Sequence, residues 1–141
     1  MERFLLIALA PLLVGAAPPA TSLEVGVERL RNARGVIRAC LTRSPEHFPD
    51  CRADPAALKR TVPATVAQVR FAGFEPGRYA LTIIHDENAN HRLDTFMAIP
   101  REGFGFSRNP KVRFGPPQFD QVAIDLGGGF ARQSVRMQYL L

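Results

Sequence analysis

The stretch FEPGRYALTIIHDENANHRLD, residues 74–94, decides the fold, because an alternating apolar pattern in it runs directly into a polar loop. Tyr79, Leu81 and Ile83 are apolar at every second position. A period of two is typical of a β-strand that turns one face toward a core. The stretch therefore predicts a strand over 79–84, followed at once by a loop rich in Asp and Asn.

The same period of two recurs on both sides of this strand. We expect residues 23–27 and 36–43 to form one hairpin across the turn Asn32-Ala33-Arg34-Gly35, and residues 65–74 and 79–84 to form a second. Glu75-Pro76-Gly77-Arg78 supplies Pro and Gly at the positions that a type II turn requires. Further alternating sets lie at 122–126 and 135–139. A short helix is expected at 54–59, where Asp54 precedes Pro55.

Six or seven short strands without a long amphipathic helix indicate an all-β protein. We expect a single antiparallel β-sandwich of about seven strands, immunoglobulin-like or transthyretin-like. One long ordered loop over 95–118 completes this expectation, since it shows little periodicity.

The first residues are typical of an exported protein. Arg3, an apolar run over 4–14 and a small-residue exit predict a signal peptide over 1–16. An uncleaved anchor is the alternative, although the run is shorter than the about 20 residues that span a bilayer. We therefore expect a linker over 17–21 and one domain over 22–141, periplasmic or secreted, without a transmembrane span in the mature chain.

The two cysteines agree with export. An oxidising compartment would join Cys40 to Cys51, and the short loop so closed would stabilise the fold by roughly 2–3 kcal/mol. A metal pair or a reactive thiol is the alternative, although no CxxC motif is present.

The formal net charge of +5 comes almost wholly from arginines spread along the chain. This balance permits an anionic partner, but a solvated sheet face explains it as well. Nucleic acid is disfavoured because the basic residues form no dense run and the chain carries an export signal.

The loop after the 79–84 strand has the spacing DxNxNxxxD, which suits calcium. The candidate ligands are side chains or carbonyls of Asp86, Asn88, Asn90, Arg92 and Asp94, completed by the remote carboxylate of Glu102. The alternative is a set of Asx turns, in which the same side chains bind backbone amides and hold no metal.

The expected long loop combines aromatic rings, cations and glycines. Its candidate ligand-binding residues are Phe104, Phe106, Arg108, Lys111, Arg113 and Phe114. Such a mixture could bind an envelope glycan, an anionic headgroup or a protein. The alternative is that the rings fold over an open end of the sandwich while the cations face water.

An enzyme is not expected. The conceivable nucleophile set is Ser107 with His85 and Asp86, and no phosphate loop, dinucleotide motif or zinc-protease motif is present. A small metal-dependent hydrolase or metal-handling protein, using the loop over 85–94 with His85 and His91 as ligands, is the competing interpretation.

Several motifs together resemble the domain-of-unknown-function 2141 family (DUF2141) of exported bacterial proteins. They are PGxY at Pro76 to Tyr79, HDEN at His85 to Asn88, LDT at Leu93 to Thr95, IPREGFGFS at Ile99 to Ser107 and RFGPPxF at Arg113 to Phe119. The resemblance implies a sandwich similar to transthyretin-like and carboxypeptidase-regulatory-like domains, and it provides no catalytic residues to carry over. His91 stands where the family's loop has glycine. We therefore expect a non-catalytic binding or interaction module of the cell envelope.

Overall fold

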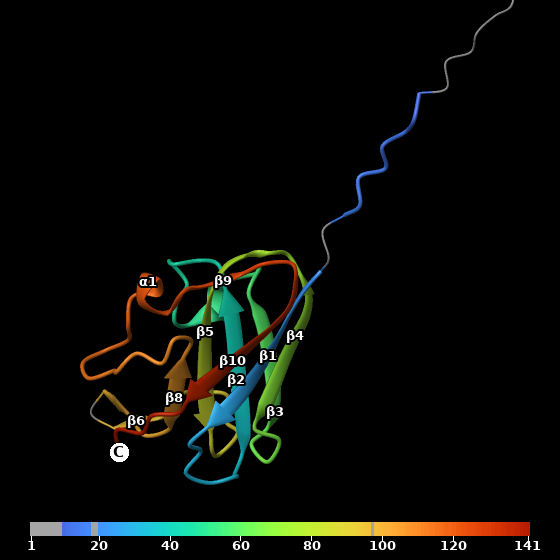
Figure 1. Ribbon diagram of the computed structural model, residues 1–141. Coiled ribbons are helices and arrows are strands. Elements are labelled where there is room, and N and C mark those ends of the chain that lie inside the picture. The colour runs from blue at the N-terminus through green and yellow to red at the C-terminus, as the bar shows by residue number, and fades with distance from the viewer. Residues whose placement is uncertain (1–9, 18–19, 97) are drawn as a thin grey trace, which may run out of the picture.

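The computed structural model describes residues 10–17, 20–96 and 98–141. Residues 10–17 run without regular structure away from the folded body (Figure 1). The expected signal peptide lies mostly at 1–9, outside the described residues. Among the described residues, no helix is long and apolar enough to cross a membrane.

Strands make up nearly all of the regular structure. They are β1 (Thr21–Glu28), β2 (Val36–Thr42), β3 (Leu58–Pro63), β4 (Gln68–Phe74), β5 (Gly77–Asp86), β6 (Thr95–Phe96), β7 (Ile99–Pro100), β8 (Gly103–Phe106), β9 (Ile124–Leu126) and β10 (Gly129–Arg136). The two helical turns are η1 (Cys51–Ala53) and α1 (Phe119–Val122).

Two sheets face each other, as Figure 1 shows. One has the order β10-β1-β4, and the other has the order β3-β2-β5-β8, with β9 paired to the start of β5. The small pair β6-β7 stands apart from both. This confirms the all-β sandwich. One pairing departs from the antiparallel pattern, because β1 and β10 run parallel.

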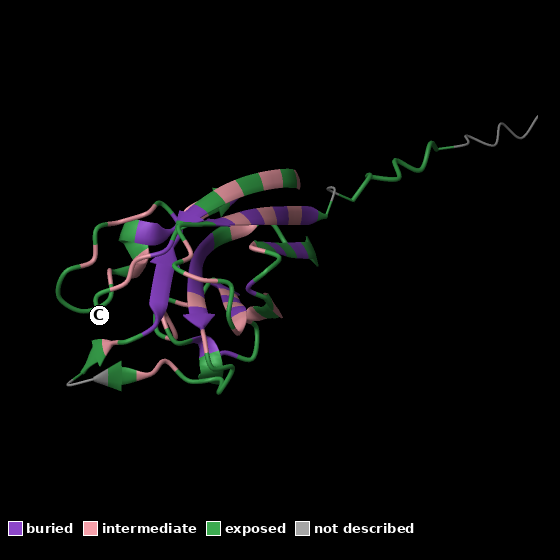
Figure 2. Ribbon diagram, turned by 90° about the horizontal axis from the view of Figure 1, so that it is seen from below, coloured by how far each residue is buried: buried purple, intermediate pink, exposed green. Residues whose placement is uncertain are grey.

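The core lies between the sheets and follows the alternation of the sequence, visible as bands along the strands in Figure 2. Its fully buried side chains include Leu23 and Val25 of β1, Val69 and Phe71 of β4, Ile37 and Leu41 of β2, and Leu81 and Ile83 of β5. Each apolar side chain of this size contributes about 1.5–3 kcal/mol when fully buried.

Both expected hairpins are wrong. β1 pairs with β10 and β4, while β2 pairs with β3 and β5. The connections from β1 to β2 and from β4 to β5 therefore cross from one sheet to the other and do not form hairpins. Gly77 begins β5 without the positive φ that a type II turn needs, whereas Gly73 has φ +73°. Alternation shows which face of a strand is buried, but it does not show which strand is its neighbour.

The helix expected at 54–59 is also wrong. Asp50 caps the short turn η1, and the carboxylate of Asp54 accepts hydrogen bonds from the Ala56 N–H and the Thr42 hydroxyl. The chain then enters β3, which pairs along β2. A weak local helix preference yields here to strand pairing.

The segment over 95–118 is not a continuous loop, since it contains β6, β7 and β8. In β8 the glycines face the other sheet and the phenylalanines face outward. A Cβ on Gly105 would lie 2.6 Å from Val135 Cγ1, and one on Gly103 would meet the Tyr139 ring. The glycines are therefore required by close packing rather than by loop flexibility.

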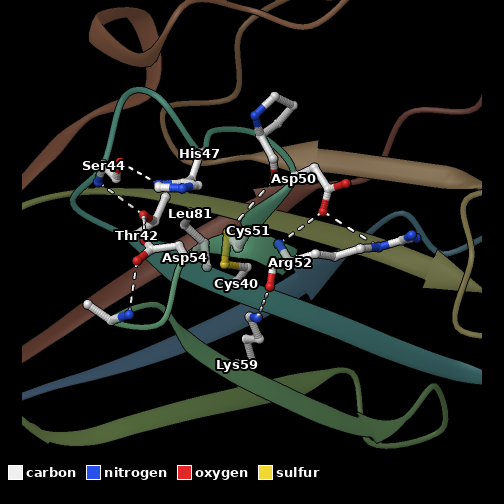
Figure 3. Close-up of a disulfide and its surroundings, with 12 residues drawn as sticks. Cys40, Thr42, Ser44, His47, Asp50, Cys51, Arg52, Asp54, Lys59 and Leu81 are labelled. Carbon is white, nitrogen blue, oxygen red and sulfur yellow. Dashed lines mark hydrogen bonds and ion pairs between the residues drawn. A yellow bond between two sulfur atoms is a disulfide. The ribbon is translucent and has the colours of Figure 1, made fainter.

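The disulfide between Cys40 and Cys51 is present, as the sequence predicted. It joins the outward face of β2 to η1 and holds the connection between β2 and β3 against the sheet (Figure 3).

Close packing at β8 gives a stability prediction. Gly105→Ala should lower the free energy of unfolding by about 1–3 kcal/mol, because the added methyl group overpacks the contact with Val135. Gly127→Ala is the matched control, since a Cβ there meets nothing within 4 Å, and it should change stability by less than about 0.5 kcal/mol. Urea denaturation measures both. Equal stability of the two variants would contradict the packing of β8 described here.

Candidate functional site

The loop that follows β5 is held by the carboxylate of Asp86. This side chain is completely buried, and it accepts hydrogen bonds from the backbone N–H groups of Asn90 (3.1 Å) and His91 (2.7 Å). His91 has φ +60°, which histidine tolerates better than most residues. The loop therefore turns at His91 around one buried acid.

Asn88, Asn90 and Asp94 bind one another. The side-chain amides of Asn88 and Asn90 donate to the Asp94 carboxylate at 2.8 and 2.9 Å. Their oxygens accept from the backbone N–H groups of Asn90 (3.2 Å) and Arg92 (2.9 Å), as in Asx turns. Hydrogen bonds from Asn90 and Asn88 hold the pKa of Asp94 below its usual range.

Glu102 reaches this loop from the residue before β8. Its carboxylate accepts hydrogen bonds from the backbone N–H groups of Glu87 (3.0 Å) and Asp94 (3.4 Å). Burial raises the pKa of Glu102, and the nearby charges of Asp86 and Asp94 act in the same direction. The structure thus brings together the acids and amides that the sequence proposed as calcium ligands, while Arg92 is exposed.

The arrangement of these residues is that of a self-bonded turn. All five candidate side chains take part in hydrogen bonds with one another or with the backbone of the loop. They are Asp86, Asn88, Asn90, Asp94 and Glu102. Within the described residues, no group of three or more His, Cys, Asp or Glu is placed to hold a metal ion. Calcium binding stays a prediction.

The side chains of the conceivable nucleophile set, Ser107 and His85, form hydrogen bonds with other groups. His85 is completely buried, and its two ring nitrogens lie 2.8 Å from the Tyr139 hydroxyl and 2.8 Å from the Arg34 carbonyl oxygen. The Ser107 hydroxyl donates to the Val122 carbonyl at 2.5 Å. Ser107 and His85 therefore have separate partners and do not form a nucleophile–base pair in this arrangement.

A groove of about 1000 Å³ lies over the outward face of the sheet β3-β2-β5-β8. Four of the predicted ligand-binding residues line it: Phe104, Phe106, Arg113 and Phe114. Arg108 and Lys111 do not line it, and Arg108 donates instead to the Asp120 carbonyl. Phe104 and Phe106 are largely buried by the cluster that forms one side of the groove, whereas Phe114 is 97 % exposed.

Sequence reasoning missed the part of the groove that comes from β2, β3 and β5. Its residues are Arg38, Cys40, Lys59, Thr61, Thr82 and Ile84. A signal was present, since β5 carries apolar or weakly polar residues at nearly every position. A strand of this composition has both faces covered rather than one face in water.

The charge of the groove is predominantly positive. Its basic lining residues are Arg38, Arg52, Lys59, Arg60 and Arg113, and among the described lining residues Asp50 is the single carboxylate. Arg38 also connects the groove to the loop. Its Nη1 donates to the His91 carbonyl oxygen at 2.6 Å, and its Nε lies 3.5 Å from the Asp86 carboxylate.

The self-bonded loop gives a prediction about stability. Asp86→Ala should lower the free energy of unfolding by about 2–3 kcal/mol in the presence of chelator, because it leaves two backbone N–H groups and Arg38 without their buried acceptor. Asn88→Ala, at an exposed position, should lower it by about 1 kcal/mol or less. Urea denaturation with chelator and with calcium measures both. A loss in Asp86→Ala that appears only with calcium would make the loop a calcium site.

The raised pKa of Glu102 predicts a pH dependence. The folded state binds the proton of the Glu102 carboxyl group more tightly than the unfolded chain does. The contribution of Glu102 to the free energy of unfolding is therefore greatest at low pH and falls as pH rises through the raised pKa. The stability of the native protein relative to Glu102→Gln should therefore fall from about pH 3 to about pH 8. Glu46→Gln, at an exposed position without an ion pair among the described residues, is the control for the loss of one carboxylate. A pH dependence for Glu102→Gln that does not exceed that of the control would contradict the prediction.

The family model for an uncharacterized protein conserved in bacteria, DUF2141, matches residues 25–134. Comparison with curated proteins and with solved structures found no match. The matched span begins in β1 and ends in β10, so it includes both sheets, the Asp86 loop and the groove. The chain belongs to the DUF2141 family, as its motifs predicted.

Proposed function

We propose that this protein is a non-catalytic binding module of the bacterial cell envelope, with the groove on the outward face of the five-stranded sheet as its binding surface. The observation that carries the proposal is the groove itself. It combines a volume of about 1000 Å³ with a largely apolar lining and a few charged groups. Small-molecule sites in proteins have this character.

The charge of the groove supports an anionic partner. Its lining residues include five cations, Arg38, Arg52, Lys59, Arg60 and Arg113, against the one carboxylate of Asp50. Asp50 is also 3.6 Å from Arg52, which offsets its charge. Complementary charge speeds association and excludes like-charged partners.

The envelope location is supported by two features. The start of the sequence has the pattern of a signal peptide, and a disulfide borders the groove at Cys40 and Cys51. Disulfides persist mainly in oxidising compartments. A non-catalytic role is supported by Ser107 and His85, whose polar atoms bind other groups.

A groove-filling variant tests the proposal. Thr61 is exposed and lines the groove from β3, so Thr61→Trp should fill the groove while the strand tolerates the large side chain. Gln68→Trp, at an exposed position of β4 in the other sheet, is the matched control.

Thermal unfolding would be measured against acidic oligosaccharides, glycerol phosphate, anionic amphiphiles and acidic peptides. A groove ligand at ten times its dissociation constant should stabilise the native protein and the control by about 1.4 kcal/mol, a shift of several degrees. The shift should vanish in Thr61→Trp. An absence of any shift across the panel, or equal shifts in both variants, would contradict the proposal.

A further inference from the structure

The chemistry of the groove changes from one side of the sheet to the other. The register places one outward pair on each strand, in the spatial order Lys59 and Thr61 on β3, Arg38 and Cys40 on β2, Thr82 and Ile84 on β5, Phe104 and Phe106 on β8. The β3–β2 half therefore carries the cations, and the β5–β8 half is apolar. Three strand spacings of about 4.8 Å make this face roughly 14 Å wide.

A further cation extends the charged half. Arg52 stands on η1, and its carbonyl oxygen accepts a hydrogen bond from Lys59 Nζ at 3.2 Å (Figure 3). Its guanidinium extends away from Lys59 toward the His91 carbonyl oxygen, which Arg38 also contacts. The Arg52 guanidinium has weak contacts, 3.6 Å to Asp50 and 3.5 Å to the His91 carbonyl. It is therefore available to a bound anion.

Two buried polar atoms lie where the halves meet. Among the described residues, Arg38 Nε and Thr82 Oγ1 are the buried side-chain nitrogen and oxygen atoms without a hydrogen-bond partner. Both residues line the groove, on the neighbouring strands β2 and β5. Both atoms lie beneath the groove surface, and Arg38 Nε is 3.5 Å from the Asp86 carboxylate, so they line the boundary between the halves without facing a ligand.

Exposed apolar side chains extend the apolar half beyond the sheet. Ile99 is 41 % exposed, Leu140 is 42 % exposed and Phe114 is 97 % exposed, and all three line the groove. A hydrocarbon chain lying here would remove part of this surface from water, which is favourable at about 25 cal/mol per Å².

We propose that the groove binds a single long-chain fatty acid, with its carboxylate at the Arg38, Arg52 and Lys59 end and its hydrocarbon chain over Ile84, Phe104 and Phe106. This inference rests on the proposed function and names its ligand class. A glycan would leave its hydroxyl groups facing the phenylalanines, and a free phosphate would leave the apolar half uncovered. A monocarboxylate with one acyl chain matches both halves.

Calorimetric titration of the folded protein tests both parts of the ligand. Dodecanoate, kept below its micelle concentration, should bind at least about tenfold more tightly than 1-dodecanol, which lacks the charge, and than butanoate, which lacks the chain. Equal binding of dodecanol or of butanoate would overturn the proposal.

Paired charge removals test the orientation. Arg52→Gln combined with Lys59→Gln should weaken dodecanoate binding by about tenfold. The double variant Arg70→Gln and Arg132→Gln removes the same charge from the other sheet, where both arginines contact Glu24, and should bind as the native protein does. Equal weakening in both double variants would show that only the overall charge matters. It would overturn the assignment of the carboxylate to the Arg52 and Lys59 end.

The position of the fatty acid's hydrocarbon chain can be measured separately by NMR. A stearate with a nitroxide near its methyl end should broaden the methyl signals of Ile84 and Val112 in an NMR spectrum more than the amide signals of Lys59 and Thr61. The reverse pattern would overturn the orientation.

The experiment separates this inference from the proposed function. If dodecanoate does not bind while another panel ligand stabilises the native protein but not Thr61→Trp, the fatty-acid proposal fails and the binding module stands. If no ligand class binds, both fail.

Discussion

The structure depends on the need to cover both faces of β5. Along this strand the inward side chains Leu81 and Ile83 are completely buried between the sheets, and the outward side chains Ala80 and Thr82 are buried as well. The outward face is covered at one end by a second apolar cluster, to which Phe48, Phe106 and Val122 belong. The cluster does not cover the whole face, and its members Ile84, Phe104 and Phe106 also line the groove that remains beside it.

The sequence was informative about faces and much less so about neighbours. Alternation correctly predicted that Leu23, Ile37 and Leu81 lie in the core, and the presence of two cysteines correctly predicted the disulfide between Cys40 and Cys51. The same alternation could not show that β1 lies beside β10, because strand partners are separated by more than a hundred residues. The sequence alone places Gly103 and Gly105 in the long loop over 95–118, since only the packed structure shows that β10 and its continuation leave no room for a side chain. The two halves of the groove belong to four strands, so their charge pattern appears only after the sheet order is known.

The proposed calcium loop and the groove are physically connected. Arg38 donates to the carbonyl of His91 and lies beside Asp86, so the self-bonded turn positions a cation of the groove. The turn therefore has a role in the proposed function that needs no metal. The disulfide acts on the other side, where it holds η1 and Arg52 over β2. The family match over residues 25–134 includes all of these residues but names no ligand.

The parallel pairing of β1 with β10 determines when the chain can fold. β1 lies between β4 and β10, and the Tyr139 hydroxyl reaches the buried His85, so the first sheet and the core both need the last residues of the chain. A polypeptide whose synthesis has not yet reached β10 cannot complete either. Contacts between such distant segments must also pay for loop closure, which slows folding. The native state therefore forms only after the residues of β10 and Tyr139 have been synthesised.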